Sequence, residues 1–237
     1  MVFLALSAAS ALLLAALAVV LWVRRPPAPL WPIAFACQIF ALLWVLGDLW
    51  ASNAVTVAEK QIAFLVLFSG SVPIVPAWWE TTRRYVRVHG LTGPWLDSRW
   101  GQLPLWFGGA AWLMAVTNIW HGQFITPVVD GRNEYRWGVQ IVFYGHYAIG
   151  AATVALCGWA ALHHASPVMR RKFLLLMAAT LAPAAANMLH LRLPGWPRED
   201  TTALGLGLAS LIMLYGILRV RLFRPMPARL AQVMKRM

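Results

Sequence analysis

Seven apolar stretches, each long enough to cross a membrane as a helix, occupy most of this chain. A bilayer core about 30 Å thick requires roughly 20 apolar residues of helix. The connections between the stretches are too short to form a separate soluble domain. The sequence therefore predicts an all-α membrane protein, a bundle of seven transmembrane helices. The predicted spans are residues 2–23, 31–52, 61–81, 103–119, 138–162, 173–191 and 201–220.

The positively charged residues predict the orientation of this bundle. If the N-terminus faces outward, 15 of the 20 Lys and Arg lie on the cytoplasmic side. Such a bias is typical of short cytoplasmic loops and places the C-terminus in the cytoplasm. The net charge of +12 is spread over several loops, so we attribute it to membrane lipid headgroups and expect no nucleic-acid partner. The outer side keeps Lys60, Arg132, Arg136, Arg192 and Arg198.

Polar side chains recur at helical spacing in the second, fourth, fifth and sixth predicted spans. The second, fourth and sixth spans end on the outer side, and the fifth span begins there. The polar stripes therefore lie at one depth if their side chains turn inward. We interpret them as a ligand pocket open to the outside; the alternative is that they only satisfy one another between helices. The candidate ligand-binding residues are Trp44, Asp48, Asn118, His121, Gln140, Tyr144, His146, Tyr147, Asn187 and His190.

Four of these candidates, Asp48, His121, His146 and His190, have side chains that can bind a transition metal. No two of the histidines share a helix at a spacing of four, so the pattern does not favour a metal site. The cofactor therefore stays unknown, and an intramembrane metal-dependent hydrolase remains the alternative function.

A retinal Schiff base in the seventh span is excluded, because that span contains no lysine. We expect the only lysines, Lys60, Lys172 and Lys235, to lie outside helix interiors.

The tail after the seventh span has its own periodicity. Pro227 suits the first turn of a helix, and the apolar residues that follow it mark one face. This helix either lies on the inner leaflet or opens a coiled coil that leads to an effector. The residues on its apolar face are Leu230, Val233, Met234 and Met237.

Several short motifs, in order along the chain, resemble the N-terminal seven-transmembrane sensor region of bacterial histidine kinases and related signalling proteins. The similarity extends over residues 31–237. The matching residues are Thr117, Asn118 and His121, then Pro183 and Asn187, then Asp200 and Thr201, and finally Arg221, Leu222 and Phe223 before Pro227.

The resemblance implies a receptor module of the bacterial inner membrane that detects a small-molecule, lipid or peptide ligand. Such modules are usually homodimers and signal to a cytoplasmic effector domain or partner kinase. On this basis residues 1–221 are expected to form the sensor domain and residues 222–237 a cytoplasmic signalling helix. The sequence has no kinase motif of its own, so we do not expect the chain as given to be an enzyme.

Overall fold

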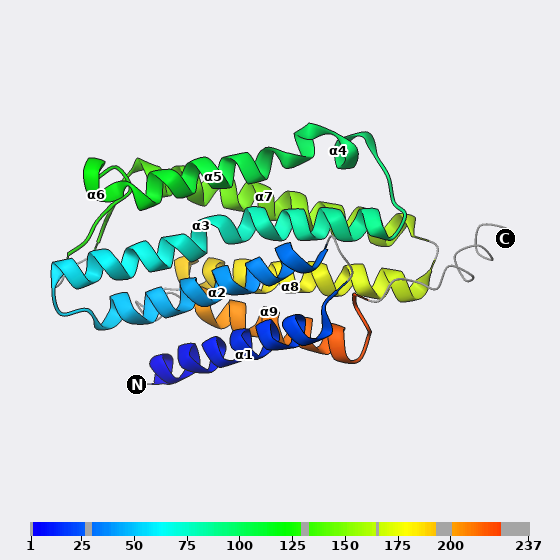
Figure 1. Ribbon diagram of the computed structural model, residues 1–237, viewed down its shortest axis with the longest axis horizontal. Coiled ribbons are helices and arrows are strands. Elements are labelled where there is room, and N and C mark those ends of the chain that lie inside the picture. Colours follow the sequence, from blue (N-terminus) through cyan, green and yellow to red (C-terminus); the bar gives the residue numbers. More distant parts are fainter. Residues whose placement is uncertain (1, 27–29, 129–132, 165, 193–200, 224–237) are drawn as a thin grey trace.

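Seven long helices run side by side along the long axis of the molecule (Figure 1). The structure is a computed structural model that describes residues 2–26, 30–128, 133–164, 166–192 and 201–223. The predicted apolar tail residues, Leu230, Val233, Met234 and Met237, lie outside the described residues. The long helices are α1 (Val2–Arg24), α2 (Leu30–Asn53), α3 (Val57–Val88), α5 (Leu103–Val116), α7 (Trp137–His163), α8 (Pro167–Arg192) and α9 (Thr202–Leu218).

Every predicted span overlaps one of these helices, so the all-α fold is confirmed. Within the described residues, α1, α2, α3, α7 and α8 are long and apolar enough to cross a membrane, and α9 is a shorter apolar helix. The remaining elements are small. They are α4 (Pro94–Asp97), the 3₁₀-helix η1 (Arg99–Gln102), α6 (Asn118–His121) and an antiparallel hairpin of β1 (Ile125–Thr126) and β2 (Glu134–Tyr135).

Helix α3 is longer at both ends than hydropathy predicts. The Thr56 hydroxyl accepts a hydrogen bond from the Glu59 amide at 3.2 Å, and the Glu59 carboxylate accepts one from the Thr56 amide at 3.1 Å. This capping box starts the helix at Val57. At the other end the helix continues through a polar segment to Val88, because backbone hydrogen bonding does not require apolar side chains.

One lysine departs from the sequence prediction. Lys60 lies in the first turn of α3, at the end of the helix, whereas Lys172 lies inside α8 with only 5% of its surface exposed. The prediction that Lys172 lies outside a helix interior was wrong, because α8 begins before its apolar stretch does. Pro167 is the first residue of α8, a position that proline favours.

Six of the helices form a closed ring. Helix α1 contacts α2 and α9, α3 contacts α2 and α7, and α8 contacts α7 and α9. Helix α5 packs outside this ring against α3 and α7. We call the end of the bundle where α3 and α9 finish the exit end, and the opposite end, which carries β1 and β2, the hairpin end (Figure 1).

Glycines allow a close approach between α2 and α3 in the ring. A Cβ at Gly70 would collide with the backbone of Phe40 and Trp44, and a Cβ at Gly47 would collide with the backbone of Leu67. Small residues at such crossings let helices pack closely where lipid supplies no hydrophobic driving force. This contact fixes α2 against α3 beside the centre of the ring.

Candidate functional site

A cavity of about 850 Å³ lies inside the ring of six helices. Its lining comes from α1, α2, α3, α7, α8 and α9, and none of it comes from α5. This volume falls within the range of pockets that hold one drug-sized molecule. The cavity is therefore large enough to be a binding site.

Apolar side chains and glycine form most of the cavity wall. Among the described lining residues there is no Asp, Glu, Lys or Arg. A charged ligand would have to lose its hydration without gaining an ionic partner, which is costly in a membrane interior. The polar residues of the wall are Gln38, His146, Tyr147, Thr153, Thr180, Asn187, Thr202 and Ser210.

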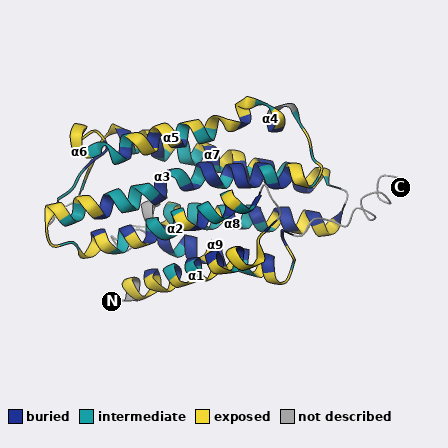
Figure 2. Ribbon diagram, in the orientation of Figure 1, coloured by how far each residue is buried: buried dark blue, intermediate teal, exposed yellow. Residues whose placement is uncertain are grey.

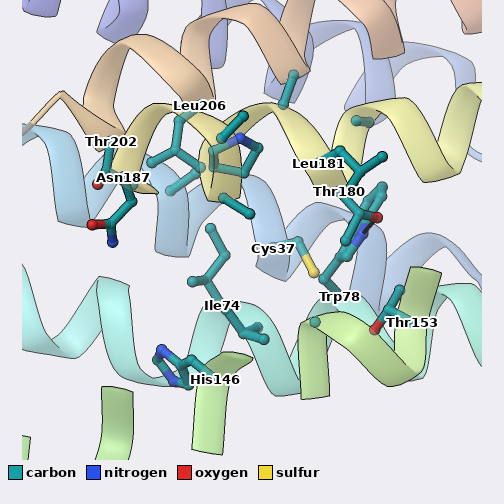
Figure 3. A pocket seen from close by; sticks show the side chains of 18 of the residues that line it. Cys37, Ile74, Trp78, His146, Thr153, Thr180, Leu181, Asn187, Thr202 and Leu206 are labelled. Atoms are coloured by element: carbon teal, nitrogen blue, oxygen red, sulfur yellow. Dashed lines mark hydrogen bonds between the residues drawn. The ribbon is translucent and has the colours of Figure 1, made fainter. Parts of the chain in front are cut away.

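Helix-to-helix hydrogen bonds hold two of the polar side chains. His146 on α7 bonds through Nε2 to the Val72 carbonyl of α3 at 3.0 Å, so Nε2 carries the proton. Trp78 on α3 donates through Nε1 to the Thr180 hydroxyl of α8 at 2.8 Å, and Figure 3 shows the two side chains pointing toward each other. These bonds connect α3 with α7 and α8 around the cavity.

Gln38 on α2 is different. Its side chain is 7% exposed and lines the cavity, yet its Oε1 has no hydrogen-bond partner in the described part of the chain. A buried amide oxygen without a partner costs roughly 1–3 kcal/mol. This atom is therefore a candidate acceptor for a bound molecule.

Four of the ten predicted site residues line the cavity: Trp44, His146, Tyr147 and Asn187. Asp48 is partly buried on α2, interacts with another residue and is not part of the wall. His190 belongs to α8, but its side chain lies outside the described residues.

The other four predicted residues lie away from the cavity. Tyr144 is 71% exposed and Gln140 is also exposed, because both occupy a face of α7 that turns away from the ring. Asn118 and His121 belong to α6, which follows α5 outside the ring. Helical spacing placed these residues at a common depth but could not show which faces point inward.

Asn118 and His121 organise the loop at the hairpin end instead. The Asn118 Oδ1 accepts hydrogen bonds from the amides of Phe124 at 2.7 Å and Ile125 at 3.2 Å, and its Nδ2 donates to the Ile125 carbonyl at 2.7 Å. His121 Nδ1 accepts from the Gln123 amide at 2.9 Å. These bonds position strand β1 after helix α6.

The metal interpretation gains no geometric support from the described side chains. Within them, no group of three or more His, Cys, Asp or Glu is arranged to hold a metal ion. His146 bonds to a backbone carbonyl, while His121 lies in the loop outside the ring.

Sequence reasoning missed Gln38, Thr153, Thr180 and Ser210 as wall residues. The three hydroxyl groups donate to carbonyls of their own helices, as such groups do in many apolar helices, so they gave no distinctive signal. Gln38 could have been found, because an isolated amide in an apolar span is itself unusual.

At the exit end, α3 carries a buried ionic cluster. Glu80 is 1% exposed and Arg83 is 3% exposed. Arg83 donates from Nε and Nη2 to the two Glu80 oxygens at 2.7 and 2.9 Å, and Arg84 Nε lies 2.6 Å from Glu80 Oε1. A further bond joins Arg83 to the Leu96 carbonyl, so the cluster anchors the short helix α4 that follows α3.

The chain that leaves α9 is attached beside this cluster. The Tyr85 hydroxyl donates to the Leu222 carbonyl at 2.7 Å, and the Tyr85 and Phe223 rings lie 6.0 Å apart. Arg221, just before, has a left-handed backbone with φ of 56°, which turns the chain back toward the bundle. We call Tyr85, Leu222 and Phe223 the exit contact.

The model of one protein family, described as "N-terminal 7TM region of histidine kinase", matches residues 6–227 of this chain. The match spans all seven long helices and the exit contact. Searches of curated proteins and of solved structures gave no significant match.

Proposed function

We propose that this chain, which belongs to the family of N-terminal 7TM regions of histidine kinases, binds an extracytoplasmic or lipid-borne ligand in its central cavity and signals to a cytoplasmic effector. The family supports a sensor module in a membrane with a cytoplasmic partner. The observation that carries the ligand proposal is the cavity itself, because α9, the helix that leads to the effector side, forms part of its wall.

All seven long helices cross a bacterial inner membrane in this proposal, with the N-terminus outside. The hairpin end then faces outward and the exit end faces the cytoplasm, as the distribution of Lys and Arg favours. Helix α5 has only 14 residues, but η1 precedes it and α6 follows it almost without interruption. Together these elements supply the length that a span requires.

Ligand binding is assigned to the cavity residues Trp44, His146, Tyr147 and Asn187, together with Gln38. A ligand that touches α8 and α9 on one side and α2 and α3 on the other can change how these helices pack. The energy available for signalling is limited to the difference in the ligand's affinity for the two packing states.

The signal leaves through α9 and the exit contact. Met213 of α9 lines the cavity, and the helix ends at Leu218, shortly before Leu222 meets Tyr85. Movement of α9 would be transmitted to residues 222–237, which we assign to a signalling helix that continues toward the effector. A homodimer fits this mode of output, since two such helices could pair.

The test is the phosphohistidine content of membranes from cells that make this protein. Wild-type cells would be compared with a deletion strain and with strains complemented by Asn187→Ala or Leu208→Ala. Asn187 lines the cavity, whereas Leu208 is on an exposed face of α9 and serves as the matched control. Western blotting would establish equal membrane abundance.

We expect deletion and Asn187→Ala to change the phosphorylation of one histidine kinase, and Leu208→Ala to leave it as in wild type. Unchanged phosphohistidine after deletion would overturn the proposed function. If both substitutions had the same effect at equal abundance, the cavity would have no role in the proposed function.

A further inference from the structure

The facing sides of α7 and α8 are open where they border the cavity. Ala151 and Ala155 on α7, and Leu181, Ala185 and Met188 on α8, line the cavity and are exposed on the surface. The other wall residues face the same cavity but are buried or half-buried, so the greater exposure of these five marks where the cavity reaches the outside. Both helices contribute such residues along the middle of the bundle.

The opposite sides of the same helices are occupied. On α7, His146 bonds to Val72 of α3 and Thr153 is fully buried. On α8, Pro183 packs against Gly205 of α9 so closely that a Cβ on the glycine would collide with it. The exposed sides therefore turn away from α3 and α9, toward the surface where α7 and α8 are neighbours.

Toward the exit end, other faces of the two helices are buried. Leu156 and Ala160 of α7, and Phe173 and Leu176 of α8, are at most 1% exposed and belong to one hydrophobic cluster. Because α7 ends at His163 and α8 begins at Pro167, the two helices are adjacent at this end, and the cavity reaches the surface farther along them. In a bilayer this opening faces the acyl chains rather than water.

We propose that the ligand is a neutral amphiphile that reaches the cavity sideways from the membrane, between α7 and α8, and donates a hydrogen bond to Gln38 Oε1. This inference rests on the proposed function, since it names the chemical class of the ligand for the same cavity. The largely apolar wall matches an alkyl chain, and the wall lacks a charged partner among its described residues.

Gln38 supplies the specific contact. Its oxygen is buried, borders the cavity and has no protein partner among the described residues. A hydroxyl or amide N–H on the ligand would satisfy it, whereas an ether would leave it without a donor. Sites that hydrogen-bond a ligand group discriminate strongly against analogues that lack that group.

The first experiment uses the full chain in phosphatidylcholine nanodiscs and a photoreactive decanol whose diazirine is on the alkyl chain. Labelled peptides would be mapped by mass spectrometry, with decanol, decyl methyl ether and decyltrimethylammonium as competitors. We expect labelling of α7 and α8 cavity residues, and competition by decanol about tenfold stronger than by the ether. The charged competitor should be weaker than decanol.

Labels confined to the lipid-facing surface, or equal competition by decanol and its ether, would overturn the proposal. The variant Gln38→Leu tests whether Gln38 accepts the hydrogen bond from decanol. Without this oxygen, decanol and its ether should compete equally. The comparison between two ligands in one protein sample does not depend on how stable the variant is.

The sideways route is tested by the labelling rate. The double variant Ala151→Phe/Ala185→Phe should slow labelling several-fold, because the two rings would fill the opening. Ala152→Phe is the matched control, since Ala152 is exposed on α7 but does not line the cavity. An unchanged rate in the double variant would refute access between α7 and α8.

The two proposals can fail separately. If decanol occupies the cavity but phosphohistidine is unaffected by deletion, the ligand class stands and the signalling function falls. If deletion and Asn187→Ala alter phosphohistidine while the labels avoid the cavity in wild type, signalling stands and the amphiphile proposal falls.

Discussion

Two regions of the α7–α8 pair differ. Residues that border the opening of the cavity, such as Ala151 and Ala185, are exposed, whereas Ala160 and Phe173, toward the exit end, are fully buried in one hydrophobic cluster. Regions with few buried contacts open at lower free energy than densely packed ones. The opening between α7 and α8 is therefore suited to admit a ligand. The part of the bundle toward the exit end, which we call the exit half, is suited to hold a fixed geometry.

Polar groups differ between the cavity wall and the neighbouring segment of α3. The Gln38 oxygen in the wall has no partner among the described residues, whereas Glu80, close by on α3, is paired with two arginines. Figure 2 shows buried residues concentrated in the exit half of α3. A ligand that pairs with Gln38 would therefore complete the polar contacts of the wall, while the contacts of Glu80 are complete without it.

The largest expected effect comes from breaking the buried ionic cluster. Glu80→Ala leaves Arg83 buried without its carboxylate, and removing one partner of such a pair costs about 3–5 kcal/mol. We expect a large drop in unfolding temperature, measured on detergent-solubilised protein. The control is Glu134→Ala, because the Glu134–Arg136 pair at the hairpin end is about half exposed on both sides and contributes little. Equal losses in the two variants would show that the exit half is not the rigid half.

A second comparison uses two glycines at the level of the cavity. Gly70→Ala should destabilise the protein by about 1–3 kcal/mol, because its Cβ collides with the backbone of α2. Gly150 lines the cavity, and a Cβ added to it would meet no other atom within 4 Å, so Gly150→Ala should be neutral or slightly stabilising. Chemical denaturation in mixed micelles measures both. Destabilisation by Gly150→Ala would mean that the cavity side of α7 is packed.

Hydropathy was sufficient to predict the seven helices, since apolar stretches of spanning length have few alternatives in a membrane. It could not predict that α5 stands outside a ring of six. Ring order depends on close contacts such as Gly70 with Phe40 and Gly205 with Pro183, and a single sequence does not show which helices meet.

The candidate site was predicted in part. The depth of a residue in the membrane follows from its position along the helix. The sequence therefore placed Trp44, His146 and Asn187 at one level, and all three line the cavity. Which residues point into the bundle depends on how each helix is rotated about its axis. These helices carry apolar residues on nearly every side, so the sequence does not reveal that rotation. Tyr144 and Asn118 were therefore misplaced: one faces outward and the other binds the β1 backbone.

A smaller effect on stability but a clear effect on output is expected at the exit contact. Tyr85→Phe removes the hydrogen bond to Leu222 and should cost about 1 kcal/mol. We expect faster hydrogen exchange at the end of α9 and altered basal phosphohistidine, with unchanged competition by decanol at the cavity. Tyr215→Phe is the control, since Tyr215 is 57% exposed on α9. A change in ligand competition would show that the exit contact also affects ligand binding in the cavity.

The smallest expected effect is a pH dependence at the exit end. Burial, helped by the charge of Arg170, lowers the pKa of His164. The Nδ1 atom of His164 accepts a hydrogen bond from the Ser166 amide at 3.1 Å, and this bond requires an unprotonated nitrogen. The folded state therefore binds fewer protons than the unfolded state, whose histidine pKa is about 6.5. The stability that His164 contributes is present above that pH and is lost as the pH falls toward its folded pKa. Thermal unfolding at a series of pH values should show this loss in wild type and a weaker loss in His164→Gln, while His163→Gln, at an exposed neighbour, keeps the wild-type slope. An identical slope in His164→Gln would show that protonation of this loop does not loosen the exit half.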